Sequence, residues 1–269
     1  MRASTVHAPH DCSAPGHNGS MTTPASADPQ LDPQLVSRID EVLSRIDAAA
    51  ARAGRDGADI TVLLATKLRT PEQIAPAVDL LRSRGRLLAV GENRAQEMAK
   101  HEDPLLAGNG VPRHFIGRLQ TNKARDVVAF GELIHSVDRD DIAEALERRA
   151  EMAGLHRDVL VQVNTSGEQS KGGYDPTPEA VIPVVQRLRG SQVLRPVGLM
   201  TIGANTSDDA AVRASLRSLR ELREEVRERL GLDDFEQLSM GMSGDLEIAV
   251  EEGATIVRVG SAIFGPRPA

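Results

Sequence analysis

The sequence predicts an α/β protein, a single (β/α)8 barrel of the TIM type preceded by one extra helix. Eight short apolar runs follow one another along the chain, and a segment with helical spacing follows each of the first seven. Aromatic residues make up only 2% of the chain, which suits a parallel sheet with an aliphatic core. The count of eight without insertions favours the barrel, and a doubly wound open sheet is the alternative.

The composition limits the class of protein. The 269 residues are 40% hydrophobic and 26% charged, with a net charge of -7 at pH 7, which fits a large folded domain and argues against a nucleic-acid-binding surface. No apolar run reaches the roughly 18 residues of a membrane span. The single cysteine, Cys12, excludes a disulfide framework, and we therefore expect a cytoplasmic protein.

The first 30 residues differ in composition from the rest. They are rich in Pro, Ser, His, Ala and Gly, show no periodicity, and lack the apolar segment of a secretory signal. We therefore expect residues 1–30 to be a disordered extension and residues 31–269 to be one domain. Met21 is an alternative start of translation, because nothing before it has a foldable pattern.

The regular pattern begins with a helix that starts at Leu31 and ends near Gly54. Its apolar residues recur at steps of three and four, as in Leu35, Ile39, Val42, Leu43 and Ile46. Because this helix precedes the first apolar run, it is the extra element of the barrel.

The predicted strands and helices then alternate. The strands cover 60–67, 87–91, 113–117, 133–137, 158–165, 194–202, 236–241 and 255–259. The helices between them lie near 71–83, 93–101, 121–129, 139–152, 177–189, 208–230 and 244–252.

Capping residues support several of these helix boundaries. Thr70-Pro71 supplies a capping threonine and a proline in the first turn, and Gln73 follows three residues after the cap. Thr177-Pro178 repeats the pair. The long helix 208–230 is closed by Gly231.

Lys67 ends the first apolar run, where a charged side chain is unexpected. Enzymes built on parallel α/β folds hold their chemistry at the carboxyl ends of strands, so Lys67 is a candidate reactive amine. A lysine at a strand end can also extend its amine to the surface, and this residue alone does not separate the two interpretations.

Two loops near the end of the chain have the composition of an anion site. After the seventh strand, Ser243 lies between Gly241 and Gly244, and a capping serine with exposed backbone N–H groups favours a phosphate. After the eighth strand, Gly260-Ser261 follows a run that Arg258 interrupts. Arg258 could be a structural ion-pair residue. A buried arginine needs a partner in either case, and a ligand atom is a credible one. Loops seven and eight are the recurrent phosphate-binding pair of such barrels.

An amine beside a phosphate site suits pyridoxal 5′-phosphate (PLP), whose aldehyde a lysine can attack. A class I aldolase could use the same residues without a cofactor. The residues by themselves leave both chemistries open.

Several segments carry more specific motifs. They are Gly-Glu-Asn at 91–93 with Gln-Glu at 96–97, His-Phe-Ile-Gly at 114–117 with Leu-Gln-Thr-Asn-Lys at 119–123, Glu-Gln-Ser-Lys-Gly at 168–172, Gly-Leu-Met at 198–200, and the run 238–265. Together they resemble the YggS/PROSC family of pyridoxal phosphate homeostasis proteins, over roughly residues 31 to 267. The resemblance implies a single barrel like the amino-terminal domain of alanine racemase, with PLP as its cofactor.

The resemblance also implies roles for individual residues. Lys67 would hold PLP as a Schiff base. The Met242 backbone with Ser243, together with Gly260-Ser261, would hold the phosphate.

Two further residues would face the ring of the cofactor. Asn93 would lie near it, and Arg258 would face the pyridine nitrogen. Because a guanidinium only donates hydrogen bonds, the nitrogen opposite it should stay unprotonated. That weakens the ring as an electron sink and disfavours carbanion chemistry.

We therefore expect a non-enzymatic PLP-binding protein of intracellular PLP homeostasis, monomeric as the resemblance implies, with apo-enzymes that need PLP as candidate recipients. A PLP-dependent amino-acid racemase of low activity is the alternative. The one tyrosine, Tyr174, is in a Gly-Gly-Tyr loop and is a poor candidate for a racemase base.

We interpret two other polar residues as structural. Glu92 is predicted to form an ion pair with Arg94, and His114, which starts a strand, is predicted to cover the lower face of the barrel.

Overall fold

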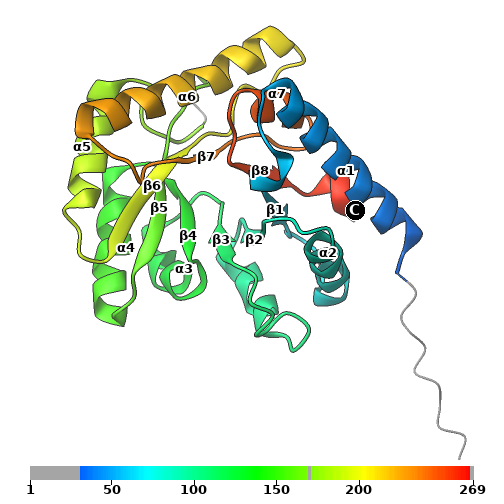
Figure 1. Ribbon diagram of the computed structural model, residues 1–269. Coiled ribbons are helices and arrows are strands. Elements are labelled where there is room, and N and C mark those ends of the chain that lie inside the picture. The colour runs from blue at the N-terminus through cyan, green and yellow to red at the C-terminus, as the bar shows by residue number, and fades with distance from the viewer. Residues whose placement is uncertain (1–30, 169–170, 267–269) are drawn as a thin grey trace, which may run out of the picture. The chain divides into compact units, whose positions relative to one another are not determined.

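The computed structural model describes residues 31–168 and 171–266. In this part of the chain, eight parallel strands close into a barrel in the order β1 to β8, and β8 pairs with β1 (Figure 1). The predicted (β/α)8 barrel and its extra first helix are confirmed. The predicted disorder of residues 1–30 lies outside the described residues and stays a prediction.

The strands are short, and each overlaps its predicted range. They are β1 (Thr61–Ala65), β2 (Leu88–Glu92), β3 (Arg113–Phe115), β4 (Leu133–Val137), β5 (Arg157–Gln162), β6 (Leu194–Met200), β7 (Gln237–Ser239) and β8 (Ile256–Val259). Several predicted strands run two or three residues too far at their carboxyl ends. The first extra residue of each still donates its N–H to the neighbouring strand, as Thr66 does to Gly91, and the residues after it form the loops at the upper end of the barrel.

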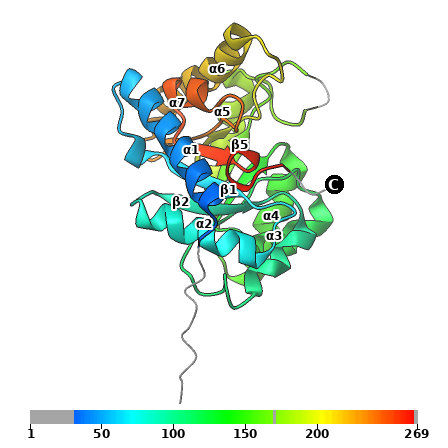
Figure 2. The same cartoon turned by 90° about the vertical axis from the view of Figure 1, so that its right-hand side faces the viewer.

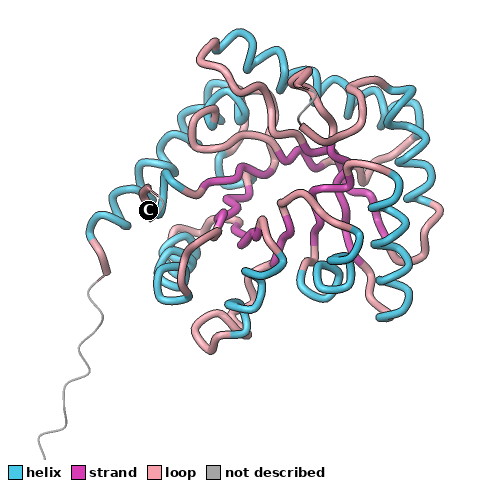
Figure 3. The backbone as a smooth tube through the Cα atoms, turned by 180° about the vertical axis from the view of Figure 1, so that it is seen from behind, coloured by secondary structure: helices cyan, strands magenta, loops and turns pink. Residues whose placement is uncertain are grey.

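The helices lie around the strands, as Figures 2 and 3 show. The α-helices are α1 (Pro33–Arg52), α2 (Pro71–Ser83), α3 (Ala124–Phe130), α4 (Asp140–Ala153), α5 (Pro178–Arg189), α6 (Asp209–Leu230), α7 (Leu246–Glu251) and α8 (Ser261–Phe264). The 3-10 helices are η1 (Gly57–Asp59), η2 (Ala95–Glu102) and η3 (Thr121–Lys123). No helix among the described residues is both long and apolar enough to cross a bilayer.

The predicted helix near 93–101 is present, but it is the 3-10 helix η2 (Ala95–Glu102) and not an α-helix. Two of its side chains bond the backbone after β1: Glu97 accepts from the N–H of Leu68, and Lys100 donates to the carbonyl of Thr66. These tertiary bonds compete with the regular helical pattern that the sequence favours.

The core has two layers because successive side chains of a strand point to opposite faces. Outside the barrel, strands and helices share a large aliphatic cluster. Inside it, a smaller cluster comprises Leu63, Ala89, Leu133, Leu160, Val197, Met200 and Ile256. The same alternation turns three polar residues inward: His135 of β4, Ser239 of β7 and Arg258 of β8. His135 and Arg258 each lie two positions after a residue of the inner cluster, Leu133 and Ile256.

Helix α1 packs beside α7 and α8 (Figures 1 and 2). Arg45 donates to both carboxylate oxygens of Glu247 and to the carbonyl of Ser243 at 3.0 Å. Arg38 donates to the carbonyl of Ile263 at 2.6 Å. The extra helix therefore fixes the two loops that follow β7 and β8.

Candidate functional site

A cavity of about 390 Å³ opens at the carboxyl ends of the strands. It is lined by residues of β1, β6 and β8 and of the loops after β1, β2, β3, β6, β7 and β8. All seven sequence-predicted site residues line it: Lys67, Asn93, Met242, Ser243, Arg258, Gly260 and Ser261. The fold thus brings together side chains that are up to 194 positions apart, from 67 to 261.

The backbone on both sides of Lys67 is fixed. Before it, Thr66 is fully buried and donates its hydroxyl to Glu92 at 2.5 Å. After it, Leu68 has a φ of 61°, in the left-handed region that residues other than glycine rarely adopt. The N–H of Leu68 donates to Glu97 at 2.6 Å. These contacts turn the chain sharply and place Lys67 at the wall of the cavity.

Glu92 is a fully buried carboxylate that supports this turn. Its Oε1 accepts from Thr66, from Lys100 Nζ at 2.9 Å and from His101 Nε2 at 2.8 Å. Oε2 has no hydrogen-bond partner among the described residues. The predicted pair with Arg94 is wrong, because Arg94 lies beyond the end of β2 and is exposed while Glu92 points into the packed side of η2.

The loops after β7 and β8 are joined. Ser243 Oγ accepts from the N–H of Ala262 at 3.3 Å and from Ser261 Oγ at 3.5 Å. Gly241 has a φ of 89°, and a Cβ there would lie 2.3 Å from Ala249 Cβ. Only glycine allows the first loop to pack this closely on α7.

Met242 lines the cavity, but its backbone N–H already donates to Asp245 Oδ1 at 2.5 Å. A phosphate bound by that N–H would have to replace the carboxylate of Asp245. The hydroxyls of Ser243 and Ser261 have no such competitor in the described residues, since they contact each other and the N–H of Ala262.

Arg258 lies inside the barrel below this pocket and is 7% exposed. It donates to the carbonyl of Ser239, to Ser239 Oγ and to the carbonyl of Thr201, each at 2.8 Å. Burial lowers the pKa of Arg258 to about 10, so the guanidinium is still charged at neutral pH. No carboxylate of the described chain is within ion-pair distance of it, and its charge faces the cavity.

Arg69 also lines the cavity, although the sequence does not predict it as a site residue. It is 8% exposed and donates to the carbonyls of Gly265 and Pro266 at 2.8 and 2.9 Å. Its position two residues after Lys67 was the available signal. Arg69 and Arg258 are thus two buried guanidinium groups that line the same cavity.

A hydrogen-bonded histidine pair was also missed. His135 bonds Ser239 Oγ through Nδ1 at 2.9 Å and His114 Nδ1 through Nε2 at 3.0 Å. His114 lines a second cavity, of about 440 Å³, at the amino ends of the strands, so its predicted place at the lower face is confirmed. A histidine inside the apolar run 133–137 was the only local signal.

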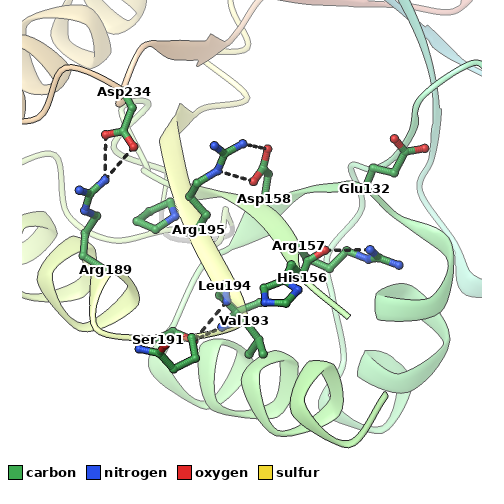
Figure 4. Close-up of a pocket in the computed structure, with 12 residues that line it drawn as sticks. Glu132, His156, Arg157, Asp158, Arg189, Ser191, Val193, Leu194, Arg195 and Asp234 are labelled. Atoms are coloured by element: carbon green, nitrogen blue, oxygen red, sulfur yellow. Dashed lines mark hydrogen bonds and ion pairs between the residues drawn. The ribbon is translucent and has the colours of Figure 1, made fainter. Parts of the chain in front are cut away.

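A larger cavity, of about 710 Å³, lies at the amino ends of β5 and β6 (Figure 4). Four of its charged side chains are paired with one another, and Glu132 and Arg157 bond backbone groups. Arg195 makes two bonds to Asp158, at 2.8 and 2.7 Å, and Arg189 makes two to Asp234, at 2.8 and 3.0 Å. Size alone therefore does not identify the functional site, because this cavity offers few free polar groups to a ligand.

Comparison with known proteins agrees with the geometry. The family described as "Alanine racemase, N-terminal domain" matches residues 14–268. The pyridoxal phosphate homeostasis protein of Aquifex aeolicus (strain VF5) is 40% identical over 230 residues, which cover 86% of this chain and 97% of that protein.

Two solved structures have the same barrel. PipY of Synechococcus elongatus PCC7942 with PLP bound is 28% identical, has a TM-score of 0.71, and matches 86% of this chain and 100% of that chain. Alanine racemase of Clostridium difficile 630, at 16% identity and a TM-score of 0.65, shares the fold over 87% of this chain and 57% of that chain. The chain therefore belongs to the alanine racemase N-terminal domain family, among the pyridoxal phosphate homeostasis proteins.

Proposed function

We propose that this protein binds PLP in the 390 Å³ cavity and serves PLP homeostasis, with Lys67 holding the cofactor as a Schiff base. One observation carries the proposal: a lysine amine, a buried unpaired cation and two serine hydroxyls line the same cavity. Two of the proteins named above support it, since the Aquifex aeolicus relative is a pyridoxal phosphate homeostasis protein and the structure of PipY has PLP bound.

The polar groups of the cavity fit the parts of PLP. Ser243 and Ser261, with the backbone at Gly260, offer donors to a phosphate, and Arg69 adds positive charge. Met242 lines the same end, but its N–H would have to leave Asp245 to take part. Asn93 also lines the cavity, and we propose that it contacts the ring.

Arg258 favours binding over catalysis. When bound, PLP supplies an aldehyde that forms imines with amines and a ring that can accept electrons. An arginine opposite the ring nitrogen can only donate a hydrogen bond to it, so that nitrogen stays unprotonated and the ring accepts electrons poorly. We therefore propose a carrier and not an enzyme.

A racemase of low activity is the second candidate, because the fold is shared with alanine racemase. Such an enzyme needs a proton base on the face of the ring opposite the lysine. Tyr174 is unsuited, because its hydroxyl donates to Asp140 at 2.7 Å and burial, with that carboxylate, raises its pKa far above the usual range.

We further propose that the protein is cytoplasmic and monomeric and delivers PLP to apo-enzymes.

The test is a PLP titration followed by absorbance, then borohydride reduction and peptide mapping. We expect saturable binding of one PLP and a reduced adduct on Lys67. Lys67→Ala should abolish the adduct, while Lys123→Ala, a lysine that does not line the cavity, should leave it unchanged. Binding without any adduct on Lys67 would refute the Schiff base.

A second arm decides between carrier and racemase. Each protein is incubated with PLP and a panel of amino acids in deuterium oxide, and exchange at the α-carbon is measured. A carrier gives exchange no faster than free PLP. Fast exchange that Lys67→Ala abolishes would establish the racemase instead.

A further inference from the structure

A chain of four hydrogen-bonded side chains crosses the inside of the barrel. Arg258 Nη1 lies 2.8 Å from Ser239 Oγ, Ser239 Oγ lies 2.9 Å from His135 Nδ1, and His135 Nε2 lies 3.0 Å from His114 Nδ1. The members come from β8, β7, β4 and β3, and all are buried. Arg258 lines the upper cavity and His114 the lower one.

The direction of the hydrogen bonds in this chain follows from Arg258 and from the burial of Ser239. A guanidinium has no acceptor, so Ser239 Oγ must accept from it. Ser239 is fully buried and its hydroxyl proton has no other acceptor among the described residues, so it donates to His135 Nδ1, which leaves the proton of that ring on Nε2. His135 Nε2 therefore donates to His114 Nδ1, and His114 carries its own proton on Nε2, at the lower cavity.

The chain is electrically neutral apart from Arg258. Burial lowers the pKa of His114 to about 4. Burial, His114 and the charge of Arg258 hold the pKa of His135 well below its usual range. The guanidinium is therefore held by neutral acceptors, and its positive charge is not balanced by theirs. A carboxylate partner would have given a pair with no net charge.

The arrangement leaves part of the guanidinium unused. Of its five N–H groups, two on Nη1 bond Ser239 and one on Nη2 bonds Thr201. The Nε–H and the second Nη2–H have no partner within the described residues. These are the donors that a ligand in the upper cavity can use.

We propose that Ser239 and His135 are positioning residues for Arg258, which hold its guanidinium so that its free N–H groups meet the ring nitrogen of bound PLP. The inference rests on the proposed function. It assigns a role to two residues outside the wall of the cavity, because neither Ser239 nor His135 lines it.

The test compares PLP with its 1-deaza analogue, in which a C–H replaces the ring nitrogen. The wild-type protein should bind PLP about tenfold or more tightly than the analogue, as expected for a hydrogen bond to a charged donor. Ser239→Ala should weaken PLP binding but leave the analogue unaffected, so the ratio of the two dissociation constants falls. A role in packing alone would weaken both ligands equally and leave the ratio unchanged.

Two substitutions of His135 give a matched pair. His135→Asn places an amide oxygen near the former Nδ1 and keeps an acceptor for Ser239. His135→Gln extends toward His114 and loses that acceptor. We expect the ratio to stay within twofold of wild type in His135→Asn and to fall at least threefold in His135→Gln. Equal ratios in both variants would overturn the proposal.

A measurement without PLP separates this proposal from the proposed function. In ¹⁵N-labelled protein, a guanidinium held in place gives separate Nη signals for Arg258, and His135 shows a protonated Nε2 and a bare Nδ1. Ser239→Ala should merge the Nη signals. If PLP fails to bind but these signals appear, the proposed function is wrong and the chain still holds Arg258. If Ser239→Ala leaves the signals unchanged, the positioning role is wrong whether or not PLP binds.

Discussion

Replacement of His114 by asparagine should make the protein more resistant to acid. In the folded state His114 is neutral, because burial lowers its pKa to about 4. In the unfolded chain a histidine has a pKa near 6.5. Between these values the unfolded state binds a proton that the folded state does not, so stability falls as the pH falls from about 6.5 towards 4.

The size of the effect follows from the two pKa values. At pH 5 the unfolded histidine is almost fully protonated and the folded one only slightly, which lowers the free energy of unfolding by about 2 kcal/mol. Below pH 4 the loss approaches about 3 kcal/mol. Asparagine keeps an oxygen near Nδ1 for His135 but does not titrate, so this loss disappears.

The assay is urea unfolding at pH 7 and pH 5. Carboxylates also contribute to acid sensitivity, so the informative quantity is the difference in loss between proteins. His156→Asn removes an exposed histidine and serves as the control. We expect wild type and His156→Asn to lose equal stability, and His114→Asn to lose about 2 kcal/mol less. An identical loss in all three would refute the reasoning.

Three further predictions concern the support of the site. Gly117→Ala should lower the free energy of unfolding by about 2 to 3 kcal/mol and weaken PLP binding, because its Cβ would lie 1.9 Å from the carbonyl oxygen of Asn93. Calorimetry measures both quantities, and unchanged PLP binding would contradict this prediction. Leu68→Val should cost about 1 kcal/mol in urea unfolding and Leu68→Gly less, since φ is 61°; the reverse order would show that the turn is not strained. Glu92→Gln should cost about 3 kcal/mol by removing the buried charge opposite Lys100, and a neutral effect in urea unfolding would rule out that ion pair as a support.

The elements predicted correctly are those with local signals. Thr70 and Thr177 begin helices as their sequence context predicts: the N–H of Thr70 donates to Gln73 at 3.1 Å, and Thr177 Oγ1 accepts from Ala180 at 3.4 Å. The site could be predicted for a topological reason. In a closed barrel the loops after β1 and β8 are neighbours, so Lys67 must lie near Gly260.

The missed contacts depend on pairings that no local pattern encodes. His135 and Ser239 are 104 positions apart, and they meet only because both face the inside of the barrel at matching heights. The predicted pair of Glu92 with its neighbour Arg94 rests on sequence distance alone. In the structure its partners Lys100 and His101 come from η2, which folds back over the end of β2.

The bonds from α1 to the far end of the chain have a consequence for biosynthesis. Arg38 and Arg45 bond carbonyls 225 and 198 positions later, so helix α1, which is made before the barrel strands, meets these partners only after β7 and β8 have been made. Until then the part of its apolar side that packs on α7 and α8 has no cover. The loops after β7 and β8 take their final positions in the same late step, so a ligand that contacts both Ser243 and Ser261 can bind only after that step.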